Sequence, residues 1–213
     1  MNTKKRSTFF FLFLSGLFFS FSSIAADLLP PQQVINTMSE QMKQALSEGT
    51  NKHNFAEFTK QVETIIYPNV DFTRMSALVL GKHWKAATKQ ERGQFIYEFR
   101  TLLTRTYSRT FLELSDWQLT FLVSRIKADA EKIIIKTKVK ADKKPEIEIH
   151  YRMISKNGQW KVYDFMIEGI SLIKNYRKSF SDEIKAAKSL TKVIEKMAKR
   201  NKAALSKPLE TKT

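Results

Sequence analysis

The chain has 213 residues, no cysteine and a formal charge of +16 at neutral pH. This length is sufficient for one domain with its own core. The lack of cysteine excludes disulfides, thiol chemistry and cysteine-bound metals, so stability must come from packing.

The first 26 residues are predicted to be a cleaved signal peptide. Residues 4–6 are basic, residues 9–21 are apolar, and small residues follow up to Ala25 and Ala26. An uncleaved anchor is the alternative, but the run is shorter than the ~20 apolar residues that a membrane span needs. Cleavage lowers the formal charge to +13. We expect such an exported protein to meet anionic membranes or acidic partners, and no nucleic acid.

Amphipathic helices are predicted in the first part of the mature chain. Apolar residues recur at helical spacing over residues 30–48 and 54–67, and Pro68 ends the second helix. Asp71 is the expected N-cap of a short third helix, which Gly81 closes.

The longest predicted helix begins at Thr88, which forms a capping box with Glu91. Its apolar stripe is wide and aromatic. Most such stripes are core, but side chains of this size also imply a large facing volume. The stripe consists of Phe95, Phe99, Leu102, Leu103, Tyr107, Phe111 and Leu114.

After Asp116 the apolar spacing changes from helical to alternating, which predicts four antiparallel strands joined by short turns. Asn157 and Gly158 form the clearest turn. Helices, a curled sheet and helices again define an α+β domain. The strands are predicted over residues 119–125, 133–140, 146–153 and 160–167.

The fourth strand is predicted to lead through Gly169 into a helix, because glycine permits a sharp turn and Leu172, Ile173 and Tyr176 restart helical spacing. Both faces of this strand are apolar. It is therefore covered on both sides or lines a cavity on one of them.

Two more helical stretches are expected near the C-terminus. Ser181 and Asp182 are the expected cap of the first, and residues 190–197 have the spacing of the last. The folded domain is predicted over residues 27–200, with a basic, disordered tail over 201–213.

The sequence contains none of the common hydrolase or phosphate-loop motifs. His53, His83 and His150 lack ligand spacing, so no metal site is predicted. Asp164 and Glu168 are a candidate acid–base pair, which makes a small enzyme the alternative function. Their other interpretation is structural, with Glu168 capping the turn and Asp164 paired within the sheet.

Several motifs together resemble one family. They are Pro68 with Asp71, LGKHW at 80–84, Ala87-Thr88 with Gln90 and the following aromatic stripe, and WKVYDFMIEGISLIKNYRKSF at 160–180. Over residues 30–200 the chain resembles the MlaC or toluene-tolerance family of periplasmic phospholipid-binding proteins. This resemblance implies a nuclear-transport-factor-like sheet that, with the helices, surrounds an apolar lipid cavity.

The resemblance also implies a non-catalytic role in the periplasm, with no cofactor and a diacyl phospholipid as cargo. The protein would shuttle lipid between an outer-membrane lipoprotein complex and the lipid-binding ring subunit of an inner-membrane ABC transporter, which maintains outer-membrane lipid asymmetry. A monomer is expected.

The lipid tails are expected to contact the long helix, the sheet and the helix after the turn. Val162 and Phe165 have opposite parity, so a regular strand would direct only one of them toward the lipid. The expected contacts are Phe95, Phe99, Leu102, Tyr107, Phe111, Phe121, Ile135, Ile149, Tyr151, Val162, Phe165, Leu172 and Tyr176.

Lys136, Lys138 and Lys140 are expected on the outer face of a strand. There they either steer the protein toward acidic partners or only keep it dissolved and block edge pairing.

Overall fold

The computed structural model describes residues 28–47, 55–112, 116–123, 126–127 and 129–206. The predicted signal peptide and the end of the predicted tail, residues 207–213, lie outside these ranges. Among the described residues, no helix is both long and apolar enough to cross a membrane.

The helices before the sheet follow the predicted pattern. Asp71 caps α3, because its Oδ1 accepts from Arg74 N at 2.9 Å. Thr88 and Glu91 form the predicted capping box, in which each accepts from the backbone N–H of the other. The five-residue helix α4 was not predicted, because it is too short to show a period. The elements are α1 (Pro30–Ser47), α2 (Phe55–Ile66), η2 (Tyr67–Asn69), α3 (Phe72–Leu80), α4 (Lys82–Ala86) and α5 (Lys89–Leu112).

The sheet is antiparallel throughout and has five strands in the order β1-β2-β3-β4-β5, one more than predicted. The fifth has only two residues, so Gly169 does not lead directly into a helix. Glu168 and Gly169, with φ of 48° and 75°, instead form the tight turn of the β4–β5 hairpin. The strands are β1 (Trp117–Phe121), β2 (Lys132–Ala141), β3 (Ile147–Lys156), β4 (Gln159–Ile167) and β5 (Ile170–Ser171).

A β-bulge in β4 changes which side chains share a face. Tyr151 pairs with Phe165, and Met153 pairs with Val162, with a register shift between them. The strand therefore has one extra residue there. Tyr151 and Met153 lie on one face of β3, so Val162 and Phe165 also share a face. The expectation that only one of them faces inward was wrong.

The C-terminal helices are α6 (Leu172–Ala187) and α7 (Leu190–Leu205). The predicted helix start at Ser181 and Asp182 was wrong, because Phe180 and Ile184 continue the buried stripe of α6 through this point. Helix α7 extends to Leu205, so the predicted disorder was wrong for residues 201–205. The tail beyond residue 206 lies outside the described residues.

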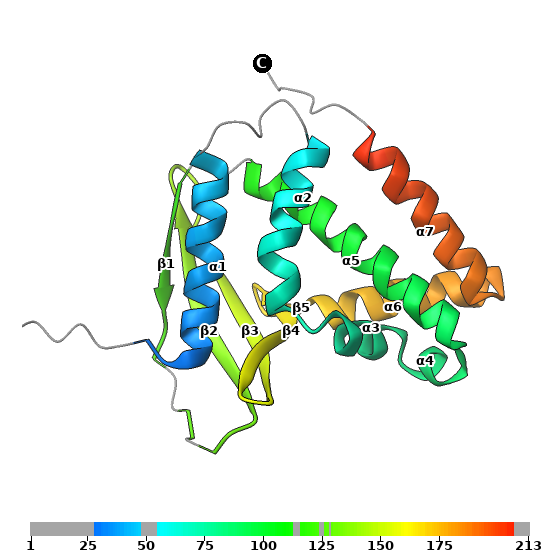
Figure 1. Cartoon of the computed structure of the whole chain (residues 1–213), viewed down its shortest axis with the longest axis horizontal. Helices are drawn as coiled ribbons and strands as arrows, with labels where there is room; N and C mark the ends of the chain where they lie inside the picture. The colour runs from blue at the N-terminus through cyan, green and yellow to red at the C-terminus, as the bar shows by residue number, and fades with distance from the viewer. Residues whose placement is uncertain (1–27, 48–54, 113–115, 124–125, 128, 207–213) are drawn as a thin grey trace, which may run out of the picture.

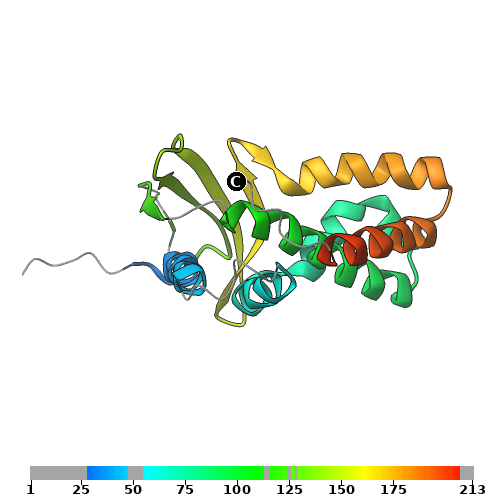
Figure 2. The same ribbon diagram turned by 90° about the horizontal axis from the view of Figure 1, so that it is seen from above.

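The molecule has a sheet end and a helical end (Figures 1 and 2). Helix α1 lies against β1 and β4, while α3, α4, α6 and the start of α7 lie at the other end. Helix α5 runs between the two ends and packs on α2, α3 and α7. Its residues therefore contribute to both parts of one continuous core.

Candidate functional site

One face of the sheet, here called the inner face, is apolar. The pairing of β1, β2, β3 and β4 places every second residue of the regular strands on this side, and the β4 bulge adds both Val162 and Phe165. The lysines at positions 136, 138 and 140 lie on the opposite, outer face, as predicted. The inner face consists of Trp117, Leu119, Phe121, Ile133, Ile135, Thr137, Val139, Ala141, Ile147, Ile149, Tyr151, Met153, Val162, Phe165 and Ile167.

An aromatic cluster, consisting of Phe95, Phe99, Tyr176 and Phe180, joins α5 to α6. The rings of Phe95 and Phe180 meet edge-to-face with centroids 5.0 Å apart, and those of Phe99 and Tyr176 do so at 5.2 Å. Phe95 and Phe99 stack at 5.5 Å. Such contacts add to the hydrophobic stabilisation of the buried rings.

The structure brings the predicted lipid contacts together, with one exception. All of them except Leu172 belong to one apolar cluster that spans α5, the inner face and α6. Leu172 is buried but lies outside it. The reason is helical spacing, because α6 buries Ile173, Phe180 and Ile184, and Leu172 lies one position off this stripe.

The predicted contacts differ in exposure. Phe95, Phe99, Ile135, Tyr151 and Val162 are buried. They contact neighbouring side chains, so the expected apolar space is filled here by the protein's own side chains. The half-buried positions come from α5, the sheet and α6, and they are Leu102, Tyr107, Phe111, Phe121, Ile149, Phe165 and Tyr176.

The apolar cluster has many members beyond the predicted contacts, and three of them that lie beside those contacts are Phe180, Met153 and Trp117. Phe180 lies four residues after Tyr176, and helical spacing would have found it if the helix had not been ended at Ser181. Met153 is fully buried beside Val162 across the strand pair. Trp117 contacts the Phe111 ring with centroids 6.1 Å apart; its position at the start of β1 gave no clear sequence signal.

The tyrosines of this interior are held in the neutral form. Burial raises the pKa of Tyr151 to about 12, although an interaction with the Thr137 side chain opposes the rise. Burial also raises the pKa of Tyr107 to about 12, with a smaller contribution from nearby Tyr176. Burial raises the pKa of Tyr176 as well. These hydroxyl groups therefore add no charge to the interior at neutral pH.

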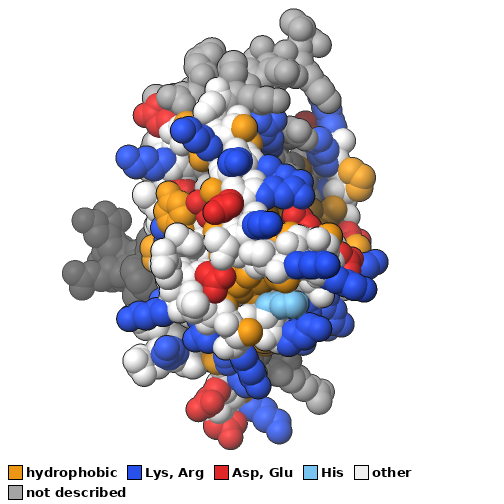
Figure 3. All heavy atoms as spheres, turned by 90° about the vertical axis from the view of Figure 1, so that its right-hand side faces the viewer, with side chains coloured by type: hydrophobic (Ala, Val, Ile, Leu, Met, Phe, Trp, Pro, Cys, Tyr) orange, Lys and Arg blue, Asp and Glu red, His pale blue; other side chains and the backbone are white. Residues whose placement is uncertain are grey.

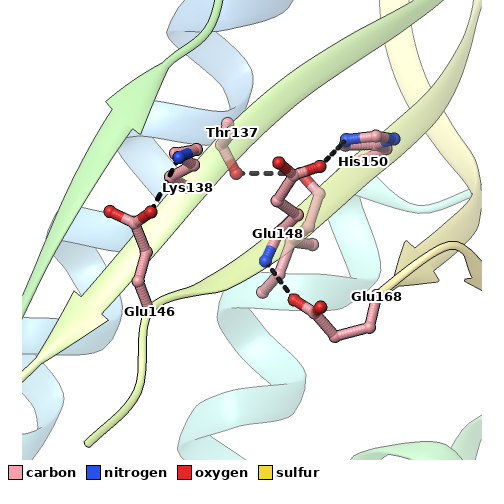
Figure 4. Close-up of polar contacts among 7 residues, drawn as sticks. Thr137, Lys138, Glu146, Glu148, His150 and Glu168 are labelled. Carbon is pink, nitrogen blue, oxygen red and sulfur yellow. Dashed lines mark hydrogen bonds and ion pairs between the residues drawn. The ribbon is translucent and has the colours of Figure 1, made fainter.

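The candidate acid–base pair has structural partners. Asp164 is fully buried, and its carboxylate accepts hydrogen bonds from Ser171 Oγ and Ile173 N. Arg152 Nη1 lies 3.6 Å from Asp164 Oδ2. Glu168 Oε1 accepts from the backbone N–H of Glu148, which ties the β4–β5 turn to β3 (Figure 4). These contacts fit the structural interpretation of both carboxylates.

Two polar contacts join side chains on the outer face of β2 and β3. Lys138 Nζ lies 2.8 Å from Glu146 Oε1, and His150 Nε2 lies 3.2 Å from Glu148 Oε2 (Figure 4). Among the described residues, no group of three or more histidine, aspartate or glutamate side chains could hold a metal ion.

Two surface recesses lie away from the predicted contacts. One, of about 760 Å³, runs along α1 beside Trp117, and its lining includes Asn36, Glu40 and Lys43. The other, of about 510 Å³, lies between α5 and α7, and its lining includes Tyr97 and Glu98. Neither recess includes a predicted lipid contact.

Comparison with known proteins identifies relatives along most of the chain. The toluene tolerance protein ttg2D of Pseudomonas putida is 26% identical over 167 residues, which are 75% of this chain and 77% of that protein. The intermembrane phospholipid transport system binding protein MlaC of Haemophilus influenzae is 24% identical over 122 residues, 56% of this chain and 57% of that protein.

A solved structure has the same fold. It is a phospholipid-binding protein from Ralstonia solanacearum in complex with a phospholipid, with a TM-score of 0.76 and 24% sequence identity. The match covers 84% of this chain and 100% of that one. The sequence model of the family described as "MlaC protein" matches residues 32–199. Because this match spans most of the sequence, the chain belongs to the MlaC family.

Proposed function

We propose that the mature protein is a periplasmic carrier that binds a diacyl phospholipid and has no catalytic activity. The observation that carries the proposal is the continuous apolar interior formed by α5, the inner face and α6. The names of the relatives from Haemophilus influenzae and Ralstonia solanacearum, which refer to phospholipid transport and phospholipid binding, support it.

The apolar character of the interior suits the physical task. A diacyl lipid has roughly thirty methylenes, and each costs about 0.8 kcal/mol when it is left in water. A free lipid therefore needs on the order of 20 kcal/mol to cross an aqueous space. A useful carrier must cover both tails, and the large side chains of α5 and the inner face offer that apolar area.

The half-buried residues mark the proposed entry for the tails. Tyr107, Phe165 and Tyr176 come from three different elements and are each partly exposed at the margin of the apolar cluster. A tail that enters here replaces contacts between the protein's own rings with contacts to methylenes, so α5 and α6 must move slightly apart from the inner face. The polar head group stays outside, where few specific contacts are needed.

The shuttle role is the finer part of the proposal. The predicted signal peptide directs the protein to the periplasm, and membership of the MlaC family favours exchange with an outer-membrane lipoprotein complex and with the lipid-binding ring subunit of an inner-membrane ABC transporter. In this role the carrier maintains outer-membrane lipid asymmetry. One monomer contains the whole apolar interior, so no second copy is required.

Extraction of the bound lipid tests the proposal. The mature protein is purified without detergent, extracted with organic solvent and analysed by mass spectrometry. We expect co-purified phospholipid in a molar amount comparable to the protein. Empty protein that also takes up no phospholipid from vesicles would contradict the proposal.

A further inference from the structure

Positive charge is concentrated at the C-terminal helices. Residues 171–206, which include α6 and α7, contain ten basic and three acidic side chains. Residues 116–170, which include β1 to β4, contain eleven basic and eight acidic side chains. The formal charge is thus +7 over the helical segment and +3 over the longer sheet segment.

All the basic side chains of this helical segment are exposed. On α6, Lys174, Lys178 and Lys185 recur at spacings that place them on one side of the helix. Figure 3 shows lysine and arginine side chains spread over the helical end of the molecule. We call the set the basic face; it consists of Lys174, Arg177, Lys178, Lys185, Lys188, Lys192, Lys196, Lys199, Arg200 and Lys202.

The two helices form one surface. Glu183 of α6 forms ion pairs with two residues of α7. Its Oε2 lies 3.3 Å from Lys196 Nζ, and its Oε1 lies 3.6 Å from Arg200 Nη1. The exposed rows of the two helices therefore adjoin. Glu183 neutralises only part of the local charge, because Asp182 and Glu195 are the only other acidic residues of the segment.

The composition of the basic face decides between two kinds of partner. A specific protein interface usually has a buried apolar or aromatic centre. Among the described residues, the exposed large apolar side chains are Leu29, Tyr97, Val123, Ile134 and Ile170, and none lies on α6 or α7. A lipid head-group layer needs no such centre, because each lysine or arginine near an anionic surface is attracted independently.

We propose that the basic face docks the protein on an anionic phospholipid bilayer. Lysine suits this role because its flexible stem lets the ammonium group follow mobile head groups. The proposal goes beyond lipid carriage, since docking does not require lipid in the interior. It would place a carrier at the bilayer that supplies or receives its cargo.

Vesicle flotation of the mature protein tests the proposal. One set of vesicles contains phosphatidylcholine alone, and the other contains phosphatidylcholine mixed with phosphatidylglycerol. We expect binding to the mixed vesicles only, weakening between low and physiological salt because screening shortens to about 8 Å at 0.15 M. Failure of the wild-type protein to bind the mixed vesicles would overturn the proposal. This holds even if the basic face were found to bind an acidic protein.

A matched pair of variants locates the surface. Lys178→Glu/Lys185→Glu/Lys192→Glu reverses three charges on the basic face and should weaken vesicle binding at least about tenfold. The control reverses three exposed lysines of the sheet strands, as Lys132→Glu/Lys136→Glu/Lys156→Glu, and should retain most of the binding. Equal weakening of both would show that only total charge matters and would overturn the proposal.

Two further readouts keep the outcomes separate. The melting temperature of each variant shows whether the fold is intact. It should stay close to that of wild type, because all six lysines are exposed. The phospholipid content of each protein, measured after solvent extraction, tests carriage by itself. A protein that docks on vesicles but contains no phospholipid and takes up none from them would contradict the proposed function and leave the docking proposal intact.

Discussion

Ser171 Oγ donates a hydrogen bond of 2.6 Å to Asp164 Oδ2, which joins β4 to the N-terminus of α6. The other carboxylate oxygen accepts from Ile173 N at 3.1 Å, and Ser171 Oγ also accepts from Lys174 N at 3.1 Å. Asp164 is fully buried. A buried carboxylate in β4 thus helps to cap the helix that carries Tyr176 and Phe180.

Replacement of this carboxylate should affect stability without affecting lipid carriage. We expect Asp164→Asn to lower the free energy of unfolding by about 1–3 kcal/mol, because a buried, charge-assisted network loses acceptors. Urea denaturation measures this loss, and lipid extraction of the folded variant should show unchanged phospholipid. The control Glu168→Gln changes an exposed turn and should cost less than about 1 kcal/mol. Loss of a catalysed reaction in Asp164→Asn at unchanged lipid content would favour the enzyme alternative instead.

Enlargement of a side chain at the margin of the interior should displace lipid. Ile149 is half-buried on the inner face, so in Ile149→Trp the indole should occupy space needed by a tail and reduce co-purified phospholipid to roughly half or less. The control Ile134→Trp places the same ring on the outer face, where Ile134 is 40% exposed. It should carry as much phospholipid as wild type. Equal lipid content in both variants would argue that the tails do not reach Ile149.

Local patterns predicted much of the fold. Capping residues such as Asp71 and Thr88 mark helix starts through their own side chains, and alternating strands such as β2 expose lysines on one face only. These signals depend on residues close in sequence, so periodicity reveals them.

Features that depend on distant contacts were missed. The β4 bulge exists only in the pairing with β3, where it lets Val162 and Phe165 share a face. Ser181 is a good capping residue, but the burial of Phe180 and Ile184 keeps α6 continuous. Tertiary packing therefore overrode the local signals at these positions. Phe180 was left out of the predicted lipid contacts for the same reason.

The C-terminal part of α7 should contribute measurably to stability. Asn201 is 2% exposed; its amide donates to Glu98 O at 2.9 Å, and its oxygen accepts from Arg105 Nε at 2.8 Å. We expect Asn201→Ala to lower the free energy of unfolding by about 1–3 kcal/mol, because the half-buried groups of Glu98 and Arg105 lose their hydrogen bonds to the buried Asn201 side chain. The exposed neighbour Lys202→Ala should change it by less than about 0.5 kcal/mol. Similar urea midpoints for the two variants would mean that the hydrogen bonds of Asn201 do not stabilise the packing of α7 on α5.

Alkaline pH should destabilise the protein through Tyr151. Its folded-state pKa is raised to about 12, so the folded protein retains a proton that the unfolded chain releases near pH 10. The stabilising contribution is complete below about pH 10 and is lost as the pH rises to about 12. It amounts to about 2–3 kcal/mol. The half-buried Tyr107, whose pKa is also raised to about 12, adds to the same loss.

The variant Tyr151→Phe isolates this contribution. Its free energy of unfolding, measured by urea denaturation, should fall less steeply than that of wild type between about pH 10 and about pH 12. The variant Tyr97→Phe is the control, because Tyr97 is 55% exposed. In Tyr97→Phe the free energy of unfolding should fall with pH as steeply as in wild type. If it also falls as steeply in Tyr151→Phe, then Tyr151 ionises freely in the folded state.

The position of the acyl tails in the loaded protein decides whether the apolar interior carries the phospholipid. A phospholipid with a photoactivatable group in one acyl chain is loaded into the mature protein and activated, and the cross-linked peptides are identified by mass spectrometry. We expect cross-links on α5, on the inner-face strands and on α6 near Tyr176. Cross-links confined to the recess along α1 or to the basic face would contradict it.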